Sequence, residues 1–242
     1  MAYTKTIIWI AAAMSTILSV AVTTLTRNHK ASKNQADVAP VENFHSIILM
    51  DESGSMMALK KTAIEGAEEV IKSVQAASDT IANVNQFLTL AFFDGNNGSL
   101  RLDYIVNNQA ICDVEADLSK YSPEGATPLY DAIGETIVNH LDKVGPHDYV
   151  LMSIITDGYE NYSRKYEASD IKRIVDSLSR KNWSFTYIGA NQDAILEGGK
   201  IGIKDAYNYD NSHSGYKNMI GWDTHRRNSI ISRIATERGW NQ

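Results

Sequence analysis

Short apolar runs alternate with amphipathic stretches along residues 44–237 of the chain. Several runs are apolar almost throughout, which predicts buried strands, and the stretches between them repeat apolar side chains at helical spacing. The predicted strands cover 44–50, 86–93, 100–106, 149–155 and 183–188. The predicted helices cover 57–78, 129–141, 171–178 and much of 214–237. The turn-forming residues Asp94 to Gly98 predict a hairpin between the second and third strands.

This alternation predicts an α/β domain: a doubly wound, mostly parallel sheet with helices on both faces. The 242 residues are enough for one large domain, and 43% hydrophobic with 21% charged residues is ordinary globular composition. The net charge of −6 and the lack of a basic stripe argue against a nucleic-acid partner. The closest approach to a basic run is the short pair Arg226-Arg227, which we interpret as part of a solvated helix face. The single Cys112 excludes an intramolecular disulfide and a cysteine-cluster zinc site, and we interpret it as a small buried side chain.

The N-terminal part differs from the rest of the chain. Residues 7–25 carry no charge and are about long enough to cross a bilayer as one helix. A membrane anchor is the favoured interpretation. A signal peptide cleaved near Ser19-Val20-Ala21 and an ordinary helix of the domain are the alternatives.

We therefore expect three parts: an N-terminal hydrophobic helix at 1–27 serving as membrane anchor or signal segment, a polar linker at 28–43, and a domain at 44–242 whose residues 204–242 form a variable extension. The chain would then be a single-pass membrane protein or a secreted one. Basic residues are denser after the hydrophobic segment than before it, which favours a cytoplasmic domain, whereas a cleaved signal would place the domain on the other side.

Short oxygen-bearing side chains stand where the predicted strands end. Asp51, Ser53 and Ser55 follow the first strand, Asp157 follows the strand at 149–155, and Thr127 precedes a helix. Ligands of open α/β sheets bind beyond the carboxyl ends of the strands, so these five side chains are candidates for one site. Carboxylates and hydroxyls suit a hard cation, Mg²⁺ first, with Mn²⁺ or Ca²⁺ as alternatives. Two carboxylates balance a divalent ion, which leaves it able to bind one further carboxylate from a partner protein.

Three segments resemble the motifs of von Willebrand factor A domains. DESGS at 51–55 resembles their D-x-S-G-S signature, ATPLYDAI at 126–133 their threonine loop, and ITDG at 155–158 their second aspartate. The resemblance covers about residues 44–200, and TDGYENYS with WSFTYIGANQDA is similar to a bacterial and phage subgroup. It implies a Rossmann-like fold and a metal-ion-dependent adhesion site formed by Asp51, Ser53, Ser55, Thr127 and Asp157. It also implies a protein-binding module, used in adhesion or scaffolding, that is not an enzyme.

Each of these side chains also has a simpler interpretation. Thr127 could cap a helix and Asp157-Gly158 could form a turn, but five independent caps are not expected to meet at one sheet edge. Among their neighbours, we expect Asp94 to be a turn residue rather than a support of the site. The remaining candidates are polar or aromatic neighbours without a predicted metal role: Glu52 and Glu160 as a solvated rim, Tyr159 and Tyr162 as partner contacts or core cover, and His45, His140, His147 and His213 as surface or core histidines.

Two rival functions are less favoured. Phosphotransferases of the haloacid dehalogenase type also place an aspartate after the first strand, but their D-x-D pattern needs a second aspartate where this chain has Ser53, which cannot do that acid–base work. The sequence also lacks a phosphate-binding G-x-x-x-x-G-K-[ST] loop, an H-E-x-x-H motif and a G-x-S-x-G elbow. The other rival is a subunit of a larger chelatase- or secretion-type assembly, whose site would bind one fixed partner.

Overall fold

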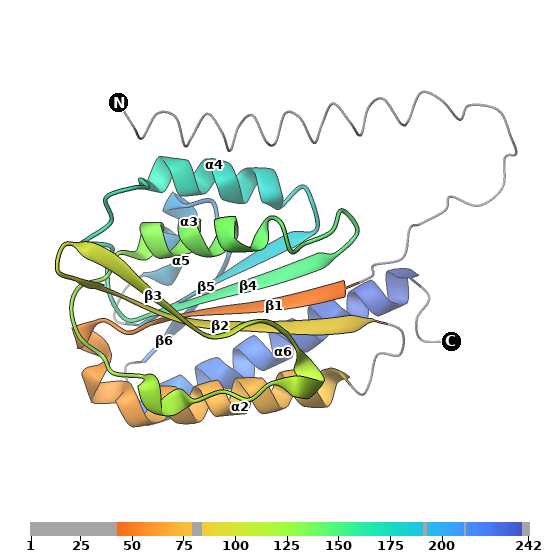
Figure 1. The fold of residues 1–242 in the computed structure, drawn as a ribbon, viewed down its shortest axis with the longest axis horizontal. Helices are drawn as coiled ribbons and strands as arrows, with labels where there is room; N and C mark the ends of the chain where they lie inside the picture. Colours follow the sequence, from red (N-terminus) through yellow and green to blue (C-terminus); the bar gives the residue numbers. More distant parts are fainter. Residues whose placement is uncertain (1–42, 79–83, 191–192, 211, 239–242) are drawn as a thin grey trace, which may run out of the picture. The chain divides into compact units, whose positions relative to one another are not determined.

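A single sheet with strand order β3-β2-β1-β4-β5-β6 forms the centre of the computed structural model (Figure 1). The structure describes residues 43–78, 84–190, 193–210 and 212–238. Only β3 is antiparallel to its neighbour, β2, and the other pairs are parallel. The strands are β1 (Asn43–Asp51), β2 (Asn85–Asn96), β3 (Ser99–Ala110), β4 (Tyr149–Thr156), β5 (Trp183–Ala190) and β6 (Asp205–Tyr209).

The apolar runs became the central strands, as predicted. Every residue of β1 from Phe44 to Asp51 is buried, and so is β4 from Val150 onward. Strands buried on both faces need helices above and below, which explains why apolar side chains occupy successive positions instead of alternating. The edge strand β3 is only partly buried, in keeping with its alternating sequence.

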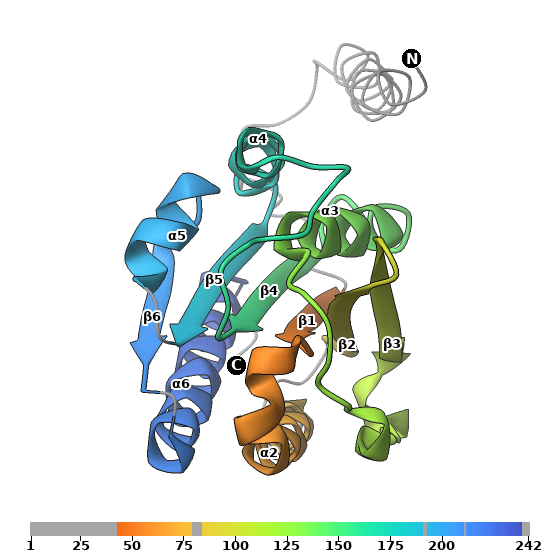
Figure 2. The ribbon, with the colours of Figure 1, turned by 90° about the vertical axis from the view of Figure 1, so that its left-hand side faces the viewer.

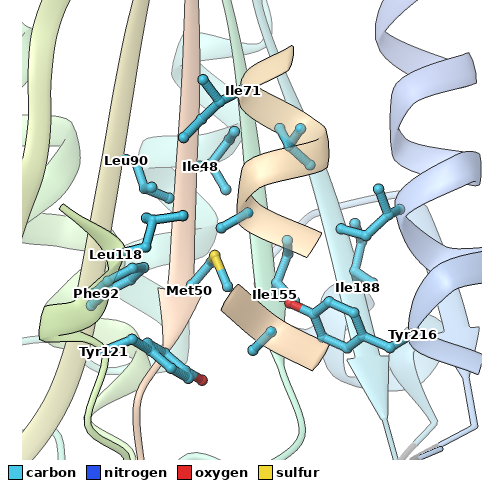
Figure 3. Packing of buried hydrophobic residues seen from close by; sticks show 14 of the residues in the cluster. Ile48, Met50, Ile71, Leu90, Phe92, Leu118, Tyr121, Ile155, Ile188 and Tyr216 are labelled. Atoms are coloured by element: carbon cyan, nitrogen blue, oxygen red, sulfur yellow. The ribbon is translucent and has the colours of Figure 1, made fainter. Parts of the chain in front are cut away.

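Helices cover both faces of this sheet, which confirms the predicted fold class (Figure 2). One face carries α2 (Lys60–Ser78) and α6 (His213–Arg238), and the other carries α3 (Leu129–His140), α4 (Ala168–Leu178) and α5 (Ala194–Lys200). In the layer under α2 and α6, Ile48, Met50 and Ile155 of the sheet pack with Tyr216 of α6 (Figure 3). Short 3-10 turns stand at η1 (Gly54–Leu59), η2 (Ile111–Asp113) and η3 (Leu118–Lys120).

Three elements depart from the prediction. The expected helix at 57–78 is divided, because η1 winds tightly as a 3-10 turn before α2 begins at Lys60. The strand β6 and the helix α5 were not predicted. Both are short, and DAYNY in β6 has too few apolar residues to stand out from a loop.

Two side chains contradict their predicted surroundings. Arg227 is fully buried, not part of a solvated helix face, and its Nη2 donates to Oδ2 of Asp223 at 2.7 Å. Asp223 in turn accepts a 2.7 Å bond from the hydroxyl of Ser153 in β4, so α6 faces the sheet with this polar group. Cys112 is exposed in η2 rather than buried.

The polarity of the strands separates two edges of the sheet. The carboxyl ends of β1 and β4 meet at one edge, whereas β1 begins at Asn43 at the opposite edge. The last turns of α6 reach that opposite edge too, because Ile231 and Ile234 pack with Phe44 near the start of β1. Both ends of the described domain therefore lie away from the edge where the candidate site forms.

The predicted anchor or signal segment at 1–27 and nearly all of the predicted linker lie outside the described residues. Within the described part of the chain, no helix combines the length and apolar character needed to cross a membrane.

Candidate metal site

The candidate site is built where β1 and β4 end side by side. These strands are parallel with Met50 opposite Ile155, so the next residues, Asp51 and Thr156, stand at the same level. Figure 2 looks onto this edge, with the ends of the central strands toward the reader. The sheet thus brings together residues that are about a hundred positions apart in sequence.

Hydrogen bonds link four of the five predicted side chains or their backbone. Oδ1 of Asp51 accepts from the backbone N–H of Ser53 at 2.7 Å. The Ser53 and Ser55 hydroxyl oxygens are 3.1 Å apart, and the Ser55 hydroxyl donates to Oδ1 of Asp157 at 2.6 Å. Because the Ser55 hydroxyl donates its hydrogen to Asp157, its oxygen can accept a hydrogen bond from the Ser53 hydroxyl or bind a cation.

Thr127 joins this group from the loop before α3. A Cβ added at Gly158 would lie 2.9 Å from Oγ1 of Thr127, 3.6 Å from Oδ2 of Asp51 and 3.7 Å from Oγ of Ser55. Side chains from the end of β1 and the turn after it, and from the loop before α3, therefore surround one point beside Gly158 in the loop after β4. Even alanine at 158 would crowd the threonine hydroxyl, so glycine keeps this space open.

Thr127 does not serve as the helix cap that was its simpler interpretation. The residue at the N-cap of α3 is Pro128, and no side chain of its own caps the helix. The first-turn amides are instead satisfied from the loop after β4: Tyr130 N–H donates to Oε2 of Glu160 at 2.9 Å, and Asp131 N–H to Oγ of Ser163 at 3.0 Å.

Glu160 is a structural support and not the solvated rim that the sequence suggested. Its Oε1 also accepts from the backbone N–H groups of Tyr162 and Ser163 at 2.8 and 2.7 Å. The next residue, Asn161, brackets Thr127 by accepting from its N–H at 2.9 Å and donating its own N–H to the Thr127 carbonyl at 3.2 Å. The loop after Asp157 thereby fixes the position of the threonine.

Glycine lets the loop before Thr127 approach the loop after β1 closely. The N–H of Gly54 donates to the Gly125 carbonyl at 3.1 Å, and Gly95 and Ala126 exchange two backbone bonds. Gly125 has φ of 71°, and a Cβ there would lie 2.3 Å from the Gly95 carbonyl oxygen. Only glycine fits at this position on both counts.

Two more acidic residues beside the site are buried. Asp94 is fully buried near the end of β2 and accepts two bonds from Arg101, at 2.8 and 2.6 Å, so its interpretation as a turn residue was wrong. Glu52, expected at a solvated rim, is also buried; it accepts from Arg101 Nη2 at 3.0 Å and from the backbone N–H of Ser122. Arg101 of β3 therefore neutralises the carboxylates next to the predicted metal residues, while burial still raises the pKa of Glu52.

Among the described residues, no cationic side chain is paired with the aspartates of the site itself, Asp51 and Asp157. Burial raises the pKa of Asp51 to about 6, although hydrogen bonds from Thr156 and Ser53 oppose the rise. Burial also raises the pKa of Asp157, opposed by the bond from Ser55. A divalent cation would offset the unfavourable burial of both charges.

The candidate donors are all oxygen atoms, which suit a hard divalent cation. In the described residues, no group of three or more His, Cys, Asp or Glu is placed to hold a metal ion. Two carboxylates and three hydroxyls are oxygen ligands suited to Mg²⁺, Mn²⁺ or Ca²⁺. Ser53, which interacts with Ser55, stands where a phosphotransferase of the D-x-D type would need its second aspartate.

The remaining candidates divide between surface and interior. Tyr159 is exposed beside the site, whereas Tyr162 packs against Gly95 and accepts a 2.8 Å bond from Gly98 N–H. His45 and His140 are buried; the ring of His140 lies 2.7 Å from both the Thr89 hydroxyl and the Thr136 carbonyl. The sequence did not single out Thr156, Asn161 or Arg101, which lack a motif of their own.

No protein-family model and no curated protein matches the sequence. Solved structures do match. A von Willebrand factor type A structure from Catenulispora acidiphila superposes with 17% identity and a TM-score of 0.53, covering 76% of this chain and 42% of that one. Proximal thread matrix protein 1 of the mussel byssus, in a structure described as having a zinc-occupied MIDAS motif, superposes with 13% identity and a TM-score of 0.53. The match covers 78% of this chain and 46% of that one. The pilus adhesin SpaC of Lactobacillus rhamnosus GG, in its open conformation, superposes with 12% identity and a TM-score of 0.55. The match covers 79% of this chain and 30% of that one.

The described domain therefore has the fold of a von Willebrand factor A domain. The chain spans less than half the length of each of these three proteins. At identities this low the likeness concerns the fold, so the bacterial or phage subgroup stays a prediction.

Proposed function

We propose that this chain is a metal-dependent protein-binding module whose cation is held by Asp51, Ser53, Ser55, Thr127 and Asp157. The observation that carries the proposal is the convergence of hydroxyl and carboxylate oxygens from three loops around the space beside Gly158. The motif resemblance, the fold, and the zinc-occupied MIDAS of a protein with a similar fold support it.

The chemistry follows from the charges. Two carboxylates balance a divalent cation, and three neutral hydroxyls add no charge, so the ion keeps affinity for one more anionic oxygen. We propose that a partner protein supplies it as an Asp or Glu carboxylate. Mg²⁺ is the first choice of cation, with Mn²⁺ and Ca²⁺ as alternatives.

The module is proposed to bind and not to catalyse. Both Asp51 oxygens already accept hydrogen bonds, from the Ser53 amide and the Thr156 hydroxyl, and the side chain is fully buried. A carboxylate so engaged suits a structural anchor of the ion better than a nucleophile. We further propose, from the sequence alone, that residues 7–25 attach the chain to a membrane.

Thermal unfolding of the full chain tests the metal site. We expect Mg²⁺ or Mn²⁺ at about a hundredfold its Kd to add about 2.7 kcal/mol and to raise Tm by about 5 to 10 °C over EDTA. Asp157→Ala and Thr127→Ala should abolish the shift. Asp176→Ala on α4 and Thr236→Ala on α6 make the same chemical changes away from the site, at a partly buried and an exposed position, and should keep it. Equal melting of the wild type in EDTA and in millimolar metal would overturn the proposal.

A further inference from the structure

Exposed apolar side chains gather at the edge of the sheet that carries the candidate site. Six large apolar residues are exposed in the described part of the chain. Four of them follow the carboxyl ends of β1, β4 and β5: Met57 at 55%, Tyr159 at 54%, Ile195 at 65% and Leu196 at 57% exposure. We name these four the apolar rim. The other two, Val138 and Leu141, lie at the far end of α3.

The apolar rim flanks the candidate site on different sides. Met57 stands two positions after Ser55 in η1, and Tyr159 two positions after Asp157. Ile195 and Leu196 belong to the first turn of α5, which follows β5, the neighbour of β4. In Figure 2 the 3-10 turn before α2 and the helix α5 stand on opposite sides of the strand ends.

Charged groups beside Tyr159 and α5 already have contacts within the domain. Lys200 binds both carboxylate oxygens of Glu197 at 2.7 and 2.9 Å, and it lies close enough to Tyr159 to interact with it electrostatically. Glu160 is engaged by backbone amides, and the Arg164 guanidinium lies 5.4 Å from the ring centre of Tyr162. The complementary partner surface therefore needs one negative charge at the cation and apolar groups around it.

We infer that the partner of this domain presents an Asp or Glu flanked by apolar side chains, with the carboxylate on the cation and its apolar neighbours on Met57, Tyr159, Ile195 and Leu196. This inference rests on the proposed function. Apolar side chains left exposed around a polar centre are the usual anchors of a protein interface, and their burial supplies binding energy that a single carboxylate–metal contact lacks.

Selection from a random peptide library displayed on phage tests the inference. The library is bound to the full chain in Mg²⁺ and eluted with EDTA, so that only metal-dependent ligands are recovered. The recovered peptides are then measured against the Ile195→Ser/Leu196→Ser double variant. The matched control is Val138→Ser/Leu141→Ser, which removes exposed apolar side chains at the far end of α3. Mn²⁺ titration of each protein reports the metal site separately.

We expect acidic peptides with apolar neighbours, bound about tenfold or more weakly by the Ile195/Leu196 variant but within about twofold by the control, with Mn²⁺ affinity unchanged. Acidic peptides with polar neighbours, or equal binding by the rim variant, would overturn the inference and leave the proposed function standing. So would normal Mn²⁺ binding with no peptide eluted by EDTA. If the wild type forms a metal-dependent dimer and the rim variant does not, the partner is a second copy of this chain, and the inference of a foreign acidic segment is overturned. Failure of the wild type to bind Mn²⁺ would remove the proposed function together with the inference.

Discussion

The hydroxyl of Thr156 lies 2.6 Å from Oδ2 of Asp51, so the end of β4 supplies a donor to the carboxylate at the end of β1. The same hydroxyl accepts from the Gly158 N–H at 3.1 Å and thereby ties the loop after Asp157 to this contact. Thr156 supports the candidate site without being one of the five predicted metal residues.

Replacement of Thr156 by valine should weaken metal binding. The change keeps the shape of the side chain but removes the hydrogen bond that lowers the pKa of Asp51. The pKa then rises, and protons compete more strongly with the metal ion for the carboxylate. We expect about tenfold weaker Mn²⁺ binding near pH 7, as is usual when a group that orients a metal ligand is removed, with partial recovery as the pH rises. Thr156→Ser keeps the hydroxyl and should bind normally. A valine variant with unchanged affinity at every pH would contradict this role.

Asp51→Asn should stabilise the metal-free domain. Burial raises the pKa of Asp51 from 3.8 to about 6, so the folded state binds more protons than the unfolded state between these values. Stability attributable to Asp51 therefore falls as pH rises through this window, by about 3 kcal/mol in total. Above about pH 6 in EDTA, the asparagine variant should be the more stable protein by denaturant titration. In Mg²⁺ the order of stability should reverse, because only the wild type is stabilised by binding the ion. An asparagine variant that is less stable than the wild type in EDTA would show that burial of the Asp51 charge carries no such penalty.

Arg101→Met should lower the free energy of unfolding, because it leaves the carboxylates of Asp94 and Glu52 without their cationic partner. Both carboxylates are buried, and removal of one partner from a buried ion pair costs about 3 to 5 kcal/mol. We expect about 3 kcal/mol, because Arg101 itself is partly exposed to water. Arg173→Met, which breaks the exposed pair with Asp170 on α4, should cost less than about 1 kcal/mol. Urea titration of both variants gives the comparison, and similar losses would contradict the buried network.

His140 should make the domain sensitive to mild acid. Burial lowers the pKa of His140 from 6.5 to about 4, so between these values the unfolded state binds the extra proton. Its contribution to stability is complete above about pH 6.5 and falls by about 3 kcal/mol as the pH approaches 4. The titration of Asp51 changes stability in the opposite direction over this pH range. The quantity to compare is therefore the difference in free energy of unfolding between the wild type and His140→Gln. That difference should shrink from pH 7 to pH 5. A constant difference would show that the pKa of His140 is the same in the folded and the unfolded state.

Much of the fold and site was predictable because the signals are local. The apolar runs at 44–50 and 149–155 became β1 and β4, and the polar residues that follow them came together because parallel strands end at one edge. The same reasoning placed Thr127, whose loop precedes α3.

Three of the wrong predictions have another cause, which is a contact with a part of the chain distant in sequence. Glu52 looked solvated because its partner Arg101 lies 49 positions away, and Glu160 looked solvated because the amide of Tyr130 lies 30 positions before it. Arg227 looked exposed because its partner Asp223 becomes a core residue only where α6 packs on Ser153 of β4. Local composition cannot reveal a buried charge whose compensation comes from tertiary packing.

The position of the domain ends has a further consequence. Asn43 and the last turns of α6 lie at one pole, and the candidate site lies at the other. Domains whose termini leave close together tolerate insertion into a host polypeptide. Here both ends of the domain leave from the pole opposite the candidate site, so attachment there leaves the edge with the candidate site exposed. The domain could thus be joined to another polypeptide at either end without covering the edge that carries the candidate site.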